Sequence, residues 1–203
     1  MNQPRKQARQ ARSRATQEAI LEATARILES EGRDALTTNG IARRAGVSIG
    51  SLYQYYPHKE AILATLMRIK RAELLELMRE ALAGSGDLPV EQAVGKMVKA
   101  GMIHQFSRPR LALELEYVEP QLGLMQETAD LAEEMAGVVL EMLRQRFPAT
   151  GLAEARDVIA ICKGMINAEA LAGAPGGEQL QLRCTRAVLG YLRECSNAPR
   201  QAK

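Results

Sequence analysis

The chain has 203 residues, of which 46% are hydrophobic and 25% charged, as is ordinary for a soluble globular protein. Its formal net charge is only +3, so the total does not demand a polyanionic partner. The distribution is uneven: residues 1–60 contain ten Lys and Arg against six Asp and Glu, a charge of +4, which leaves −1 for residues 61–203. The N-terminal end therefore has the charge expected of a segment that meets phosphates.

The cysteines and the apolar runs exclude several classes of protein. Cys162, Cys184 and Cys195 are odd in number, widely spaced and without a CxxC pair, which argues against a disulfide framework and against a zinc site. The longest apolar run, residues 158–174, is interrupted by three polar residues and falls short of the roughly 20 apolar residues of a membrane span. The basic N-terminus has no apolar stretch behind it, unlike a secretory signal. We expect a soluble cytoplasmic protein without membrane association.

The first segment is a basic tail. Residues 1–17 carry five cations and no acid; the cations are Arg5, Lys6, Arg9, Arg12 and Arg14. Because no apolar residue anchors this stretch, we predict a disordered arm over residues 1–12. Two interpretations stay open, an arm that contacts DNA, for example in the minor groove, and a solubilising tail.

Beyond the tail, the sequence predicts an all-α protein of about nine helices. Apolar residues recur with helical spacing almost everywhere, and strand patterns are nearly absent. The first helix ends at Gly32, and the others are expected at 38–45, 49–55, 59–83, 90–105, 109–117, 122–147, 152–172 and 178–195. We expect a DNA-binding domain at 13–58, a connecting helix at 59–83, a ligand-binding and dimerisation domain at 84–195, and a frayed tail at 196–203.

Residues 38–56 have the pattern of a helix-turn-helix. Gly46 supplies a left-handed turn cheaply, Val47 fills the corner, and Ser48 can cap the second helix. Leu52 and Tyr56 share the inward side with Val47. The opposite surface is small and polar enough to approach a DNA groove, as a recognition helix must. It consists of Ile49, Gly50, Tyr53 and Gln54, with Ser51 and Tyr55 at its flank.

This segment resembles the N-terminal domain of TetR-family repressors. The resemblance rests on Ile41-Ala42, on the stretch from Ala45 to Tyr56, and on Lys59-Glu60 at the head of a long helix. A LacI-type regulator also uses an Ala-Gly-Val-Ser turn, but there the motif opens the chain and lacks the Leu-Tyr-x-Tyr stretch. The specific resemblance covers about residues 16–65, and beyond it only the helical layout and the chain length agree.

The resemblance implies which residues contact DNA. Those that would contact phosphates are Thr38, Tyr53, Tyr55 and Lys59, and those that would face the major groove are Ser48, Ile49, Gly50, Ser51 and Gln54. Among the groove residues, Gln54 is the strong hydrogen-bonding reader, suited to adenine. The chain departs from the family at Tyr56, which replaces the usual Phe, so its hydroxyl needs water or a partner. The cap of the preceding helix lies at Thr37, Thr38 or Asn39.

The resemblance also implies that the last two helices pair with those of a second subunit. A stripe of small residues in the penultimate helix would let another helix approach closely. The expected interface residues are Ala160, Gly164, Ala168, Ala172, Cys184, Val188 and Tyr191. These residues can equally be ordinary intrachain core. A pocket for a small-molecule effector is implied by the family, with candidate lining residues Met102, Phe106, Leu113, Tyr117, Met125, Met165, Asn167 and Glu169.

These features predict a homodimeric DNA-binding transcriptional regulator, a repressor released from a palindromic operator by a small-molecule inducer. The alternatives are an activator of the same fold and a helical interaction protein without DNA binding. We expect no enzymatic activity and no cofactor, because the chain has two histidines and no phosphate loop, nucleophile elbow or HExxH motif. A metal sensor is disfavoured by the scattered Cys and His, so no metal is expected.

Overall fold

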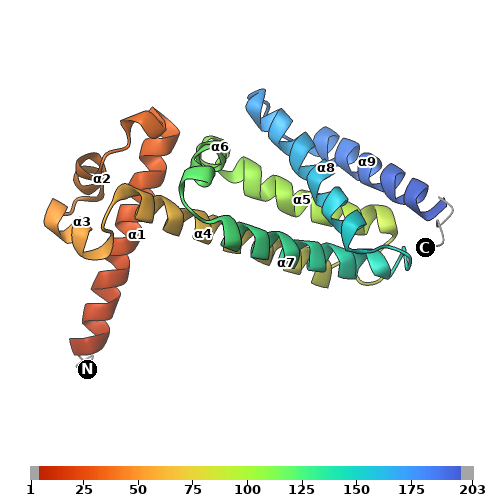
Figure 1. Ribbon diagram of the computed structural model, residues 1–203, viewed down its shortest axis with the longest axis horizontal. Helices are drawn as coiled ribbons and strands as arrows, with labels where there is room; N and C mark the ends of the chain where they lie inside the picture. Colours follow the sequence, from red (N-terminus) through yellow and green to blue (C-terminus); the bar gives the residue numbers. More distant parts are fainter. Residues whose placement is uncertain (1–4, 198–203) are drawn as a thin grey trace. The chain divides into compact units, whose positions relative to one another are not determined.

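The computed structural model describes residues 5–197, and over that range the chain forms nine α-helices and two short 3-10 turns (Figure 1). The helices are α1 (Arg5–Glu31), α2 (Thr38–Ala45), α3 (Ile49–Tyr55), α4 (Lys59–Ala83), α5 (Val90–Ser107), α6 (Pro109–Val118), α7 (Met125–Arg144), α8 (Leu152–Leu171) and α9 (Glu178–Asn197). The turns are η1 (Arg33–Ala35) and η2 (Glu119–Gln121). The all-α prediction is confirmed, and most helix boundaries fall within two residues of those expected.

Two helices differ from the prediction in extent. Helix α7 begins at Met125 and not at 122, because η2 and Gly123, with φ at +67°, redirect the chain first. Helix α1 begins at Arg5, where a disordered arm was expected, so that prediction is wrong for residues 5–12. The segment is rich in Ala, Arg, Gln and Lys, all strong helix formers, and this propensity prevails without apolar anchors. Residues 1–4 of the arm and 198–203 of the frayed tail lie outside the described residues.

The chain divides into two compact units that differ from the expected domains. The first contains the residues up to Ile69 together with 110–124, and the second contains 70–109 together with the residues from Met125 onward. Helix α4 is therefore shared between the two units. Helix α6, expected in the effector domain, belongs to the unit that holds α1, α2 and α3.

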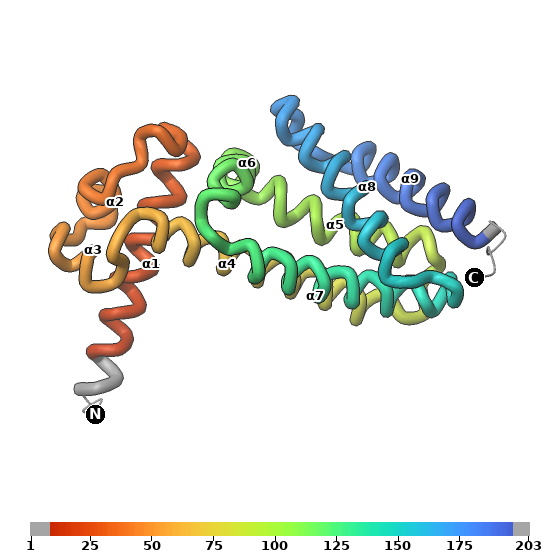
Figure 2. Tube along the Cα trace, in the orientation of Figure 1, coloured from red at the N-terminus to blue at the C-terminus, as the bar shows by residue number. Residues whose placement is uncertain are grey.

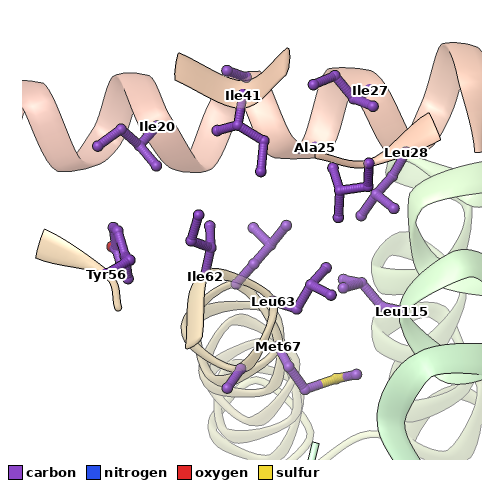
Figure 3. Packing of buried hydrophobic residues seen from close by; sticks show 14 of the residues in the cluster. Ile20, Ala25, Ile27, Leu28, Ile41, Tyr56, Ile62, Leu63, Met67 and Leu115 are labelled. Atoms are coloured by element: carbon purple, nitrogen blue, oxygen red, sulfur yellow. The ribbon is translucent and has the colours of Figure 1, made fainter. Parts of the chain in front are cut away.

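The first unit has its own apolar core (Figure 3). Ile20 and Leu28 of α1 lie fully buried, and Ile62 of α4 and Leu115 of α6 point into the same interior. Complete burial of one such side chain contributes about 1.5–3 kcal/mol, so a few of them suffice to fix short helices such as α2 and α3. Ile41 and Leu52 are the fully buried residues by which those two helices join this core.

The second unit packs α5, α7, α8 and α9 around a separate core. Two glycines of α5 face neighbouring helices, and the contact is tight at one of them, Gly101. A Cβ at Gly95 would lie 3.5 Å from Nε2 of Gln181, and one at Gly101 would lie 3.3 Å from Cδ1 of Ile166. The loop between α4 and α5 is held by Arg146, whose guanidinium donates to the backbone carbonyls of three loop residues, Ser85, Gly86 and Leu88.

Candidate nucleic-acid interface

The turn between α2 and α3 has the geometry that its sequence predicts. Gly46 adopts the left-handed conformation, with φ at 69° and ψ at 28°. The amide of Val47 then donates to the carbonyl of Ala42 at 3.0 Å, and Val47 packs against the core. Ser48 caps α3, because its Oγ accepts a hydrogen bond from the amide of Ser51 at 3.0 Å. Local chemistry thus fixes the angle at which α3 leaves α2.

The start of α2 resolves the open choice of cap. Thr37 is the capping residue, and its Oγ1 accepts from the amide of Gly40 at 3.0 Å. A Cβ at Gly40 would lie only 3.0 Å from that same oxygen, so a glycine keeps the cap uncrowded. The unusual Asn39-Gly40 start of this helix therefore has a local reason.

The outer face of α3 is exposed as expected of a recognition helix. Tyr53 keeps 51% of its surface accessible and Ile49 keeps 38%, and Gly50 and Gln54 are also exposed. Leu52, on the opposite side, is completely buried. The exposed face carries one amide, one phenol and a glycine, which together allow close approach to base edges.

The hydroxyl groups beside this face are already engaged with each other. The oxygens of Ser48 and Ser51 lie 2.8 Å apart, and Oγ1 of Thr38 lies 3.3 Å from the hydroxyl of Tyr53. The second contact joins α2 to α3 on the exposed side. Both pairs keep unused donor or acceptor capacity, so each can also meet a phosphate oxygen. Tyr55 is half-buried and packs against the core, so less of its surface is exposed than in Tyr53.

Lys59 has a structural partner that the sequence did not reveal. Its Nζ is half-buried and donates to the backbone carbonyl of Leu36 at 3.3 Å. The contact holds the segment before α2 against the first turn of α4. An ammonium group has three donors, so two remain for a phosphate.

Tyr56 is buried, and its hydroxyl has the partner that its position requires. The side chain is 6% exposed and forms a hydrogen bond with Thr65 of α4. Burial raises the pKa of Tyr56 above its usual value, and the bond to Thr65 offsets part of that rise. The phenol is therefore neutral, and its hydrogen bond links the end of α3 to α4.

Two arginines brace this unit in ways that the sequence analysis missed. Arg44 of α2 pairs with Glu31 of α1 at 2.9 Å and donates to Oγ of Ser30 at 3.3 Å. Arg33 pairs with Glu114 of α6 at 3.2 Å, and its guanidinium lies 3.4 Å from the centre of the Tyr117 ring. Contacts between residues so distant in the chain leave no periodic pattern in the sequence.

Comparison with known proteins places this geometry in a family. The family model described as bacterial regulatory proteins of the tetR family matches residues 20–66, the segment that contains α2 and α3. Residues 20–66 therefore form the DNA-binding domain of a TetR-family regulator. The chain is accordingly a DNA-binding transcriptional regulator, and the expectation drawn from the resemblance is confirmed.

The relatives agree with this assignment. The chain is 22% identical over 139 residues to the fatty acid metabolism regulator protein of Bacillus subtilis, covering 68% of this chain and 72% of that protein. It is 31% identical over 84 residues to the HTH-type transcriptional repressor KstR of Mycolicibacterium smegmatis, covering 40% of this chain and 41% of the repressor. A TetR-family regulator from Streptomyces coelicolor has the same fold, with a TM-score of 0.66, 21% identity, and coverage of 88% of this chain and 98% of that one.

The second unit places the expected interface residues in two groups. Ala160, Gly164 and Ala168 of α8 and Ala172, which follows its last residue, are exposed, as a contact surface requires. Cys184 and Val188 of α9 are completely buried in the core of the same chain, so the prediction that they meet a second subunit is wrong. Tyr191 is half-buried and donates to Oδ2 of Asp157 at 2.5 Å. Helical spacing identified one side of α9, and that side faces inward.

The expected pocket residues are also dispersed. Met102 and Phe106 line an open groove of about 610 Å³ between α5 and the start of α9. Tyr117 belongs to the first unit, where it packs against Arg33, and Leu113 of α6 lies in the same unit. Three others have no place in that groove. Met125 is 87% exposed, Glu169 pairs with Arg183 at 2.5 Å, and Met165 packs against the core of the second unit. Asn167 is half-buried on α8.

Within the described 5–197 range, no cluster of three or more His, Cys, Asp or Glu side chains is arranged to hold a metal ion. No described helix combines the length and the hydropathy needed to cross a membrane. The DNA-binding unit is thus the site to which the geometry and the comparisons both point.

Proposed function

We propose that the protein is a homodimeric repressor that binds a near-palindromic operator through α3 and leaves it when a small molecule binds the second unit. The observation that carries the proposal is the exposed face of α3, with Gln54 and Tyr53 presented on a helix capped at both ends by local contacts. The family assignment and the KstR repressor among the relatives support repression over activation. Since the partner is genomic DNA, the proposed site of action is the cytoplasm.

The proposed dimer surface is the outer side of α8 and α9. Leu171 is 73% exposed and Leu182 is 42% exposed, and apolar side chains of that size gain by being covered. Gly164 and Gly190 have open space where a Cβ would stand, so a second helix can approach at those points. A symmetric pair of chains would present two copies of α3 to half-sites about 34–36 Å apart, or a multiple of that distance.

The proposed effector site is the groove lined by Met102 and Phe106. The groove is lined by apolar side chains together with Lys99 and Glu178, and Lys99 offers a cation to a molecule with an apolar body and an acidic head. The fatty acid metabolism regulator among the relatives supports a ligand of the fatty acyl class. The wall opposite α5 is Gly176, where a Cβ would lie 2.6 Å from the Phe106 ring.

Binding to the DNA around the protein's own gene tests the proposal. A gel shift should give a complex that resists competitor DNA and that contains two chains per operator.

Palmitate and palmitoyl-CoA should each be tested for release of the complex, with tetraphenylphosphonium as the cationic comparison. Gly176→Ala should reduce release, because the new methyl group displaces Phe106. Gly173→Ala is the matched control: Gly173 has the same left-handed backbone in the same loop, with no atom near the new Cβ. Absence of any specific complex would contradict the proposal.

A further inference from the structure

Helix α1 extends well beyond the core that it helps to form. Ile20 is the first buried residue of α1 among those whose side chains are described, and the residues from Arg9 to Ala19 are exposed or half-buried. In the tube view, α1 continues beyond the part of it that lies beside α2 (Figure 2). At 1.5 Å per residue, Arg12 lies about 12 Å and Arg9 about 16 Å from Ile20 along the helix axis. We call residues 9–19 the α1 overhang.

The α1 overhang is positively charged and unpaired. Arg9, Arg12 and Arg14 are all exposed, and the first acid of the helix is Glu18. Within the described part of the chain, none of these three arginines forms an ion pair. A fold gains little from three unpaired cations on a stretch of helix that contributes no buried side chain, whereas a polyanion would pair with them.

Two of these arginines lie on the inner face of the helix. Arg9 and Arg12 stand eleven residues, or about three turns, before Ile20 and Ala23, so each projects within about 20° of its buried counterpart. Arg14 lies about 180° from Ala23, on the opposite side. The inner face of α1 looks onto Tyr56 and Ile62, where α3 gives way to α4 (Figure 3). Arg9 and Arg12 therefore project toward the side of the unit that carries the α3–α4 turn.

The helical form of the overhang limits what it can contact. An α-helix with side chains is about 10–12 Å across, and the minor groove of DNA is about 6 Å wide. The overhang cannot enter that groove as a flexible arm would. The major groove is about 12 Å wide, which is comparable to the distance of about 12–16 Å by which Arg12 and Arg9 lie beyond Ile20, so the overhang is long enough to reach phosphates that border a groove occupied by α3.

Resting on the proposed operator binding by α3, we propose that Arg9 and Arg12 hold the phosphate backbone that flanks each half-site. The contact is electrostatic and independent of sequence, and it lengthens the footprint of each half-site. Arg14, on the outer face of the same helix, takes no part in it. The partner is double-stranded DNA, recognised by the spacing and charge of its phosphates.

Charge removal on opposite faces of the helix tests the proposal. The full-length R9Q/R12Q variant should lower the slope of log affinity against log salt by about 1.8, because two counterions are no longer released. Arg14→Gln, which removes one of the same charges from the outer face, should leave the slope nearly unchanged. Hydroxyl-radical footprinting should show that R9Q/R12Q loses protection outside the half-site and keeps it within the half-site. If R9Q/R12Q and Arg14→Gln lowered the salt slope by the same amount per charge removed, the proposal would be overturned, and the basic segment would act as a diffuse cationic tail.

A proline introduced into α1 distinguishes contact with DNA by a rigid helix from contact by a flexible arm. Ala15→Pro keeps all three arginines and interrupts α1 between them and the core, so it should lose flanking protection as R9Q/R12Q does. Circular dichroism and thermal unfolding would verify that the core remains folded. Wild-type affinity in Ala15→Pro would overturn the proposal, and so would wild-type binding in R9Q/R12Q at low salt. In either case the wild-type complex itself still forms, whereas failure of the proposed function would remove the complex for every variant.

Discussion

The guanidinium of Arg33 lies 3.4 Å from the centre of the Tyr117 ring, although 84 positions separate the two residues in the chain. Arg33 follows α1, and Tyr117 stands near the end of α6. The same guanidinium pairs with Glu114, one turn earlier in α6. Helix α6 is thereby tied to the unit that binds DNA, although it and η2 follow α5 in the chain.

Loss of this contact should weaken the first unit. We expect Arg33→Ala to lower its free energy of unfolding by about 1–2 kcal/mol, since a partly covered cation–π contact and an ion pair are both lost. Chemical denaturation followed by the fluorescence of the tyrosines would measure the change. Arg26→Ala, which removes an exposed ion pair with Glu22 on the same helix, should cost less than about 0.5 kcal/mol. Equal losses in the two variants would show that Tyr117 adds nothing.

The dimer surface can be tested at a glycine that nothing in the chain itself touches. We expect Gly164→Leu to raise the dimer dissociation constant and, through it, to weaken operator binding. A Cβ at Gly164 meets no atom within 4 Å, so the larger side chain does not disturb the fold of one chain. Gly137→Leu is the matched control, because Gly137 is also exposed on a helix, α7, with no atom near its Cβ. Sedimentation that showed a stable monomer on DNA for the wild type would rule out the dimer.

Lys59 should contribute to binding on all DNA sequences alike. Lys59→Ala should lower the slope of log affinity against log salt by about 0.9, one released counterion, and leave base preference unchanged. It should also reduce stability by about 0.5–1.5 kcal/mol, because the carbonyl of Leu36 loses its donor. Lys99→Ala, in the second unit, is the control for loss of an exposed lysine. A change in base preference for Lys59→Ala would contradict its role as a phosphate contact.

The three thiols should differ sharply in reactivity. Burial disfavours the thiolate and raises the pKa of Cys162 to about 12, and burial also raises the pKa of Cys184. At pH 8 only about one Cys162 in 10⁴ is then ionised, and the thiolate is the reactive form. We expect a thiol reagent to label Cys195, which is exposed, quickly, and the other two only after unfolding. In the Cys195→Ser variant only Cys162 and Cys184 remain, and fast labelling of that variant without denaturant would contradict the burial of these two thiols.

The local features of the DNA-binding unit were predictable because each depends on adjacent residues. Gly46, Val47 and Ser48 specify a turn by conformational freedom, size and capping, and the structure has that turn. The contact of Arg33 with Tyr117 was not predictable, since no periodic pattern links residues so far apart. Helix α6 was assigned to the effector domain by its place in the chain, whereas its apolar residues pack in the first unit.

The second unit shows a different limit. Helical spacing correctly grouped Cys184 with Val188 on one side of α9, but spacing does not tell whether that side faces the same chain or another. Both residues are buried within the chain. The α1 overhang was misjudged for the opposite reason: its charge suggested disorder, while its Ala, Gln and Arg content favours helix.

The most direct test of the account is the base preference of Gln54. Wild-type protein and Gln54→Ala should be compared on an operator and on a set of single base-pair substitutions of it, at one salt concentration. Gln54 is exposed on α3 and suited to a bidentate contact with adenine, so we expect Gln54→Ala to cost about 1–3 kcal/mol on the operator. The loss should be confined to one base position per half-site, where the variant no longer discriminates. An unchanged preference at every position would contradict the claim that α3 reads the operator through this face.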